Sequence, residues 1–102
     1  MEITKEVKNK KMIVKVSGQI NTITAPELEK EVYGKLANID TVVMDLKHVD
    51  YISSAGIRVF SMVQRILGNK DNFSVINVDK NVYKILDDIG LTDFMNIERY
   101  EQ

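Results

Sequence analysis

The sequence predicts an α/β fold, a single domain built on a mixed, mostly parallel β-sheet with helices packed mainly on one face. The main observation is that short apolar segments rich in Val and Ile alternate along the chain with longer segments of helical periodicity. The first two strand-like segments are instead neighbours, which predicts a hairpin before the alternation begins. The expected order is β-β-α-β-α-β-α-β, and a length of 102 residues suits one domain spanning residues 1–102.

The leading hairpin is expected from residues 2–7 and 12–18, and the second of these segments alternates apolar and polar side chains clearly. Residues 8–11 between them are polar, as hairpin turns usually are. Asn9 tolerates the positive φ that tight turns require. These two segments should supply the antiparallel pair of the sheet.

A first helix is expected to begin near Thr24, because Thr24 and Glu27 have the spacing of a capping box and Pro26 suits a first turn. The buried stripe of this helix should be formed by residues at helical spacing, namely Leu28, Val32 and Leu36. Residues 41–46 then form a compact apolar run, which is expected to be a central strand covered on both faces.

A second helix is expected from Ser53 or Ser54 to a stop signal at Gly68. Its apolar side should comprise Val59, Met62, Val63, Ile66 and Leu67, with Arg58, Ser61, Gln64 and Arg65 on the other side. Residues 73–78 predict a further strand. A third helix ending at Gly90 should then bury Val82, Ile85, Leu86 and Ile89, and a last strand is expected around residues 94–97.

Charge and composition exclude several functional classes. The 14 basic and 15 acidic residues give a net charge of −1, whereas nucleic-acid-binding domains carry an excess of Lys and Arg. The absence of cysteine excludes disulfides, thiolate metal sites and cysteine nucleophiles. Apolar runs fall far short of the ~20 residues of a membrane span, and no signal core is present at the N-terminus. The chain is expected to be cytoplasmic, without nucleic-acid or membrane partners and without a cofactor.

The most informative segment leads from Asp45, near the end of the central strand, to the helix start at Ser53-Ser54-Ala55-Gly56. Ligand sites in open α/β sheets tend to lie at the carboxyl ends of strands, and helix N-termini favour anions. A serine there could cap the helix, or it could carry a phosphate in a favourable field. Small residues such as Ala55 and Gly56 also allow a helix to approach a sheet closely, so spacing alone leaves both readings open.

The segment from Val43 to Ile57, with its Asp-Leu and Ser-Ser-Ala-Gly elements, resembles the signature of the STAS domain, the domain named for sulfate transporters and anti-sigma factor antagonists. Residues 18–25 are similar to the family's Gly-x-Leu/Ile-Asp-x-x-Thr-Ala segment, and residues 82–91 match as well. The resemblance spans nearly the whole chain and leaves no room for a second domain.

The resemblance to stand-alone bacterial anti-sigma factor antagonists implies a partner switch. In that scheme the unmodified domain, a monomer when free, binds an anti-sigma factor that is also a serine kinase, and a sigma factor is released. The kinase then phosphorylates a serine at the helix start, the complex separates, and a metal-dependent serine phosphatase resets the domain. By position the phosphoacceptor is Ser54. Ser53 and Asn21 stand where many members have Asp, and Ala55 where many have Ser or Thr.

The partner-binding residues implied by the resemblance and by helix geometry surround this serine: Asn21, Thr22, Ser53, Ser54, Ala55, Gly56, Ile57, Arg58 and Ser61. Ile57 shares the polar side of the second helix with Ser61, so it is either an anchor for the partner or an apolar residue covered by a loop. We therefore take the chain for a binding protein rather than an enzyme.

Three alternatives remain. The domain could bind a nucleotide or another small anion at the helix start, or it could switch an output other than a sigma factor. A serine hydrolase using Ser54, His48 and Asp45 is the third, although the Gly-x-Ser-x-Gly elbow of such enzymes is missing.

Overall fold

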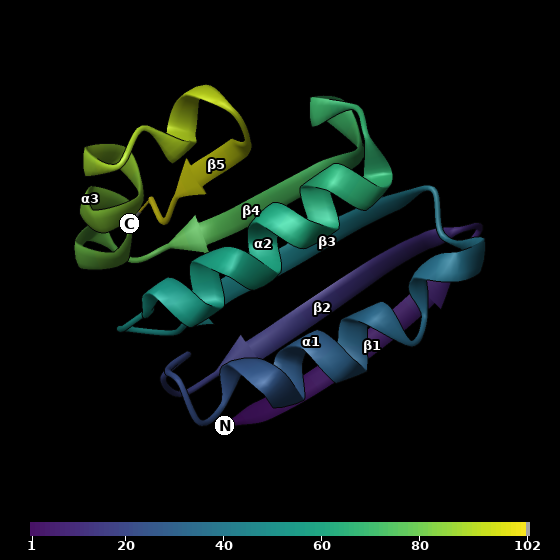
Figure 1. The fold of residues 1–102 in the computed structure, drawn as a ribbon, viewed down its shortest axis with the longest axis horizontal. Coiled ribbons are helices and arrows are strands. Elements are labelled where there is room, and N and C mark those ends of the chain that lie inside the picture. Colours follow the sequence, from purple (N-terminus) through teal and green to yellow (C-terminus); the bar gives the residue numbers. More distant parts are fainter. Residues whose placement is uncertain (102) are drawn as a thin grey trace.

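The computed structural model describes residues 1–101, which fold into a sheet with α-helices lying over one side of it (Figure 1). The strands are β1 (Glu2–Lys8), β2 (Lys11–Ser17), β3 (Thr41–His48), β4 (Phe73–Val78) and β5 (Asn96–Arg99). The α-helices are α1 (Ala25–Tyr33), α2 (Ser54–Leu67) and α3 (Lys80–Asp88). The predicted order of elements is confirmed.

The five strands lie in the sheet in the order in which they occur in the sequence. β1 and β2 are antiparallel, whereas β2 with β3, β3 with β4 and β4 with β5 are parallel. The hairpin closes through the two residues Asn9 and Lys10, both at positive φ (51° and 64°), as a twist-matched hairpin turn requires. The sheet is therefore mixed and mostly parallel, as the sequence predicts.

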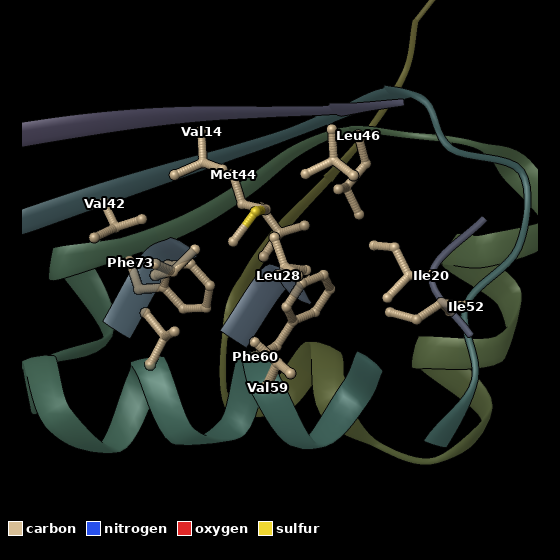
Figure 2. Close-up of a cluster of buried hydrophobic side chains, with 14 of the residues drawn as sticks. Val14, Ile20, Leu28, Val42, Met44, Leu46, Ile52, Val59, Phe60 and Phe73 are labelled. Carbon is tan, nitrogen blue, oxygen red and sulfur yellow. The ribbon is translucent and has the colours of Figure 1, made fainter. Parts of the chain in front are cut away.

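The core lies between the sheet and the helices. Leu28 of α1 and Phe60 of α2 are fully buried against strand residues such as Val14 and Met44 (Figure 2). Phe60 also meets Phe73 of β4 edge-on, with ring centroids 6.3 Å apart. No helix within residues 1–101 has the length and apolar character needed to cross a membrane.

The other face of the sheet carries no helix, which corrects the expectation for residues 41–46. β3 is central in the sheet, but its side chains alternate: Val42, Met44 and Leu46 are buried, and Thr41, Val43 and Asp45 are half-buried. The helices that connect the parallel strands all cross on the same side, so one face alone is covered.

The start of α1 differs from the predicted capping box. The Thr24 hydroxyl donates to the Gln19 carbonyl (2.7 Å) and accepts from the backbone N–H of Asn21 (2.8 Å), so it does not cap α1. The Asn21 side-chain oxygen instead accepts from the N–H groups of Ile23 (2.9 Å) and Thr24 (3.0 Å). Thr24 is therefore the N-cap residue of α1 by position, as predicted, but without a side-chain cap, and the Asn21 side chain instead holds the turn that precedes α1. The stripe of Leu28, Val32 and Leu36 is buried as predicted, with Leu36 beyond the end of α1.

The buried stripes of the other two helices differ from the prediction. α2 ends at Leu67, with Gly68 as its C-cap as expected, and buries Val59 and Val63 as predicted, but it also buries Gly56 and Phe60, while Met62 and Leu67 are half-buried and Ile66 is 47% exposed. Val82 and Leu86 of α3 are buried, but Ile85 and the C-cap residue Ile89 are exposed, because this helix covers the sheet chiefly at edge strand β5. β5 begins two residues later than predicted, and Phe94 before it is exposed.

Candidate functional site

The carboxyl ends of β2 and β3 bring together two loops that are distant in the sequence. The backbone N–H of Ile20 donates to the Tyr51 carbonyl (3.0 Å), and the N–H of Ser53 donates to the Ile20 carbonyl (2.8 Å). Ile20 and Ile52 pair as an isolated parallel bridge, and their side chains lie side by side near the first turn of α2 (Figure 2). The segment that begins with Asn21 is thereby fixed beside the start of α2.

The two serines at the start of α2 have different environments. Ser53 is the N-cap residue, with extended backbone (φ −94°, ψ 172°), and its carbonyl accepts from the N–H of Ile57 (3.0 Å). Its Oγ is buried and has no hydrogen-bond partner among residues 1–101, so Ser53 caps through its backbone alone. Ser54, the first helical residue, is exposed. The two adjacent serines therefore differ: Ser54 is an exposed residue, and the Oγ of Ser53 is buried.

Gly56 lies inside this site rather than on its surface. The residue is buried, and a Cβ placed on it would be 2.5 Å from Cγ2 of Ile20 and 2.8 Å from Cγ1 of Ile52. The glycine therefore lets the first turn of α2 pack directly on the Ile20–Ile52 bridge. Gly56 is thus buried in the free domain, where it supports the first turn of α2 that carries Ser54, and its contact with a partner stays a prediction.

The other predicted contact residues differ in exposure. Thr22 and Arg58 are exposed like Ser54, whereas the half-buried set comprises Asn21, Ser53, Ala55, Ile57 and Ser61. Ile57 packs against the edge of the core, so it is neither a free apolar side chain nor a full core residue. We call the outward-facing group of Thr22, Ile23, Ser54, Ile57 and Arg58 the Ser54 surface.

Ile23 was missed by the sequence analysis. Its side chain is 84% exposed, more than any other large apolar side chain among residues 1–101. The available signal was an isoleucine inside the polar stretch Asn-Thr-Ile-Thr, between a strand and a helix stripe to which it does not belong. Exposed apolar residues are common singly, but this one follows directly on Asn21 and Thr22 at the candidate site.

The residues of the hydrolase alternative do not form a catalytic triad. Within residues 1–101, no hydrogen bond joins Ser54 to His48 or Asp45. The Asp45 carboxylate instead accepts from the Lys47 N–H (3.0 Å) and from Asn77 Nδ2 (3.1 Å). Asp45 lies on the face of β3 that the helices leave open, whereas Ser54 begins a helix on the covered face of the sheet. Within residues 1–101 the geometry therefore does not join Ser54 to the other two residues of this alternative.

Comparison with known proteins identifies relatives over nearly the full chain. The family model described as STAS domain matches residues 2–102. The anti-sigma-B factor antagonist of Staphylococcus epidermidis is 32% identical over 87 residues, which cover 82% of this chain and 80% of that protein.

Two solved structures have the same fold. An anti-sigma factor antagonist from Mycobacterium paratuberculosis superposes with a TM-score of 0.85 at 24% identity, over 95% of this chain and 84% of that one. The anti-sigma factor antagonist SpoIIAA in its unphosphorylated form superposes with a TM-score of 0.79 at 13% identity, over 94% of this chain and 87% of that one.

Proposed function

This chain belongs to the STAS domain family of bacterial anti-sigma factor antagonists, and from this premise we propose that it is a phosphorylation-controlled partner switch. In its unphosphorylated form it binds an anti-sigma factor that is also a serine kinase, and this binding releases a sigma factor. Phosphorylation of Ser54 ends the interaction, and a serine phosphatase restores the binding form. In this proposal the protein acts in the cytoplasm as a substrate of the kinase and not as an enzyme.

The observation that carries the proposal is the contrast between the two adjacent serines. Ser54 presents an exposed hydroxyl at the first position of α2, while the Oγ of Ser53 is buried. A kinase must bring the γ-phosphate of ATP in line with an accessible hydroxyl, and Ser54 offers one without rearrangement of the helix. The missing carboxylates at positions 21 and 53 leave this hydroxyl without a neighbouring negative charge from either residue.

The proposed partner surface is the Ser54 surface. It combines apolar side chains, the exposed Ile23 and the half-buried Ile57, with the cationic Arg58. Apolar anchors and arginine are the residue types that dominate binding energy in many protein interfaces. The backbone hydrogen bonds of Ile20 with Tyr51 and Ser53 hold the two parts of this surface together before a partner arrives, which lowers the entropy cost of binding.

A phosphate on Ser54 would break such an interface electrostatically. It adds a charge of about −1.5 to −2 at neutral pH to a surface that complements a neutral hydroxyl. Inside the interface that charge loses its water without gaining a matched partner, which is a strongly unfavourable change. The switch therefore requires no large conformational change in the domain.

The test is a kinase assay on the folded protein. The kinase is isolated from native extract by pull-down on the unphosphorylated domain, purified, and incubated with ATP and each of three variants. Wild type and Ser53→Ala should be phosphorylated, and mass mapping should place the phosphate on residue 54. Ser54→Ala should bind persistently and remain unmodified. Phosphate on Ser53 would refute the assignment of Ser54 as the phosphoacceptor. Stable binding with no phosphate on either serine would mean that the protein binds its partner without being switched by phosphorylation.

A further inference from the structure

A pocket lies on the face of the sheet that the helices leave open. It has a volume of about 320 Å³ and is lined by residues of β2, β3 and β4 near their carboxyl ends: Lys15, Val16, Asp45, Lys47, His48 and Asn77. This volume is at the lower end of the range of small-ligand sites, about 300–1,000 Å³. Crevices at the carboxyl ends of parallel strands are also the usual ligand positions in open α/β sheets.

Two β-bulges in neighbouring strands shape this pocket. Lys15 and Ser17 of β2 pair with Asp45 and His48 of β3, so β3 has one extra residue there. In β4, the interval from Val75 to Val78 likewise has one residue more than the facing interval of β5. Bulges re-aim side chains and occur often beside binding sites. At the first bulge, the consecutive residues Lys47 and His48 are both exposed, which interrupts the alternation of the strand. At the second bulge, Asn77 has a positive φ of 56°.

Asp45 joins the two bulges. Its Oδ1 accepts from the backbone N–H of Lys47 (3.0 Å) in the first bulge and from Asn77 Nδ2 (3.1 Å) in the second. Asn tolerates a positive φ better than most residues, and the hydrogen bond from its side chain to Asp45 holds Asn77 in that conformation. Asp45 thus links the two bulges, because its Oδ1 accepts one hydrogen bond from each of them.

The pocket carries two lysines against one carboxylate, Asp45, so its net positive charge favours an anion. Neither Lys15 nor Lys47 forms an ion pair within residues 1–101, so both ammonium groups are available to a ligand. The Lys47 Nζ lies 5.4 Å from the centroid of the Tyr100 ring, which restricts where this long side chain can place its charge. His48 adds a ring N–H donor, and lysine is a common ligand of phosphate groups.

We propose that the paired bulges of β3 and β4 form a binding pocket for a small phosphate-bearing molecule, held by Lys15, Lys47 and His48 and buttressed by Asp45. The pocket is separate from the Ser54 surface, and the inference does not rest on the proposed function. Inorganic phosphate and a sugar phosphate share the phosphate group that the two lysines would bind. The volume leaves room for more than a phosphate, so a phosphomonoester of a small polyol is the occupant expected to bind more tightly.

The test is an amide NMR titration of the intact protein with inorganic phosphate, with glucose 6-phosphate and with neutral methyl glucoside. Both phosphates should shift the amides of residues 15–16, 47–48 and 77 with saturation at millimolar concentrations, and methyl glucoside should not. Tighter binding of glucose 6-phosphate would identify a phosphomonoester site, and equal affinities a site for free phosphate. Shifts confined to residues 53–57, or no saturating shift, would overturn the proposal.

A charge-matched pair of double variants separates the pocket from general electrostatic attraction. Lys15→Gln with Lys47→Gln should weaken phosphate binding by about tenfold or more, since charge-assisted contacts are the strong ones. Lys30→Gln with Lys35→Gln removes the same charge from exposed positions around the end of α1 and should leave the affinity unchanged. Equal losses in the two double variants would overturn the proposal. The amide spectrum itself reports whether each variant is folded.

Discussion

Helix α2 approaches Ile20 so closely at Gly56 that a single added Cβ would lie 2.5 Å from Cγ2 of the isoleucine. This contact seats the first turn of α2 on the strand extension that also carries Asn21. The geometry of the Ser54 surface therefore depends on a residue without a side chain, one layer below the surface.

Gly56→Ala is expected to destabilise the fold even though alanine is the better helix former. Helix propensity would favour alanine by about 1 kcal/mol. The clash with Ile20 and Ile52 involves packed side chains, and overpacking of this kind costs about 1–3 kcal/mol. Urea denaturation should show a net loss of stability. Gly34→Ala, where the nearest atom to the new Cβ is 3.3 Å away, should change stability much less. Equal effects of the two substitutions would argue against close packing at Gly56.

Ile23→Ser is expected to weaken kinase binding without affecting the fold. An 84% exposed side chain contributes little to the core, whereas an apolar anchor in an interface is worth about 1–3 kcal/mol of binding free energy. Isothermal titration calorimetry measures the binding, and thermal unfolding checks the fold. Ile89→Ser, at the exposed residue directly after α3, is the matched control and should bind like wild type. Unchanged binding of the Ile23 variant would remove this residue from the interface.

Ile57→Ala should affect both stability and binding, because Ile57 is half-buried against the core as well as part of the Ser54 surface. Removing its outer carbons should lower the free energy of unfolding by about 1 kcal/mol, less than a fully buried isoleucine would. Kinase binding measured well below the unfolding temperature should fall as well. A loss of stability with full binding would make Ile57 a packing residue only.

Lys5 of β1 and Glu31 of α1 form an ion pair with Nζ and Oε2 2.6 Å apart, and this hydrogen bond lowers the pKa of the Glu31 carboxyl from its ordinary 4.5. A carboxyl whose pKa is lower in the folded state stabilises the fold above its unfolded pKa, and the contribution is lost as pH falls through the folded pKa. NMR titration should show the pKa of Glu31 rising in Lys5→Met. An unchanged pKa would mean that the pair is not formed in solution.

Sequence periodicity predicted the order of elements because the spacing of apolar residues shows which side chains are buried in a helix or a strand. The alternation of strands and helices then predicts a mostly parallel sheet with helical crossovers. It could not place the edges of the buried stripes. Ile66, Ile85 and Ile89 satisfy helical spacing, but whether they are covered depends on how far each helix extends over the sheet, which is a property of the assembled fold. The side-chain cap of α1 was wrong for a related reason. Thr24 is the N-cap residue, yet its hydroxyl bonds to Gln19 and Asn21 in the preceding turn and does not cap the helix.

The candidate site was predictable in part. The Ser-Ser-Ala-Gly segment identified the helix start, and the similarity to the family joined it to the region of Asn21. No sequence pattern distinguishes the buried hydroxyl of Ser53 from the exposed one of Ser54, because that difference arises from the Ile20–Ser53 hydrogen bond that turns the chain into α2. The two bulges were equally invisible, since a bulge is defined by the register of the partner strand.

Ser54→Asp should remain fully folded while it binds the kinase weakly. A negative charge in the first turn of α2 lies near unpaired N–H groups and the positive end of the helix dipole, which stabilises it by about 0.3–1 kcal/mol. The matched control is Ser61→Asp, a half-buried position in the middle of the same helix, where no free N–H groups are available and the charge should destabilise the fold. Circular dichroism with urea denaturation measures both variants, and calorimetry measures kinase binding by Ser54→Asp. A loss of helicity in Ser54→Asp would instead mean that a charge at this position acts by unfolding α2. Intact structure with lost binding would locate the switch in the interface itself.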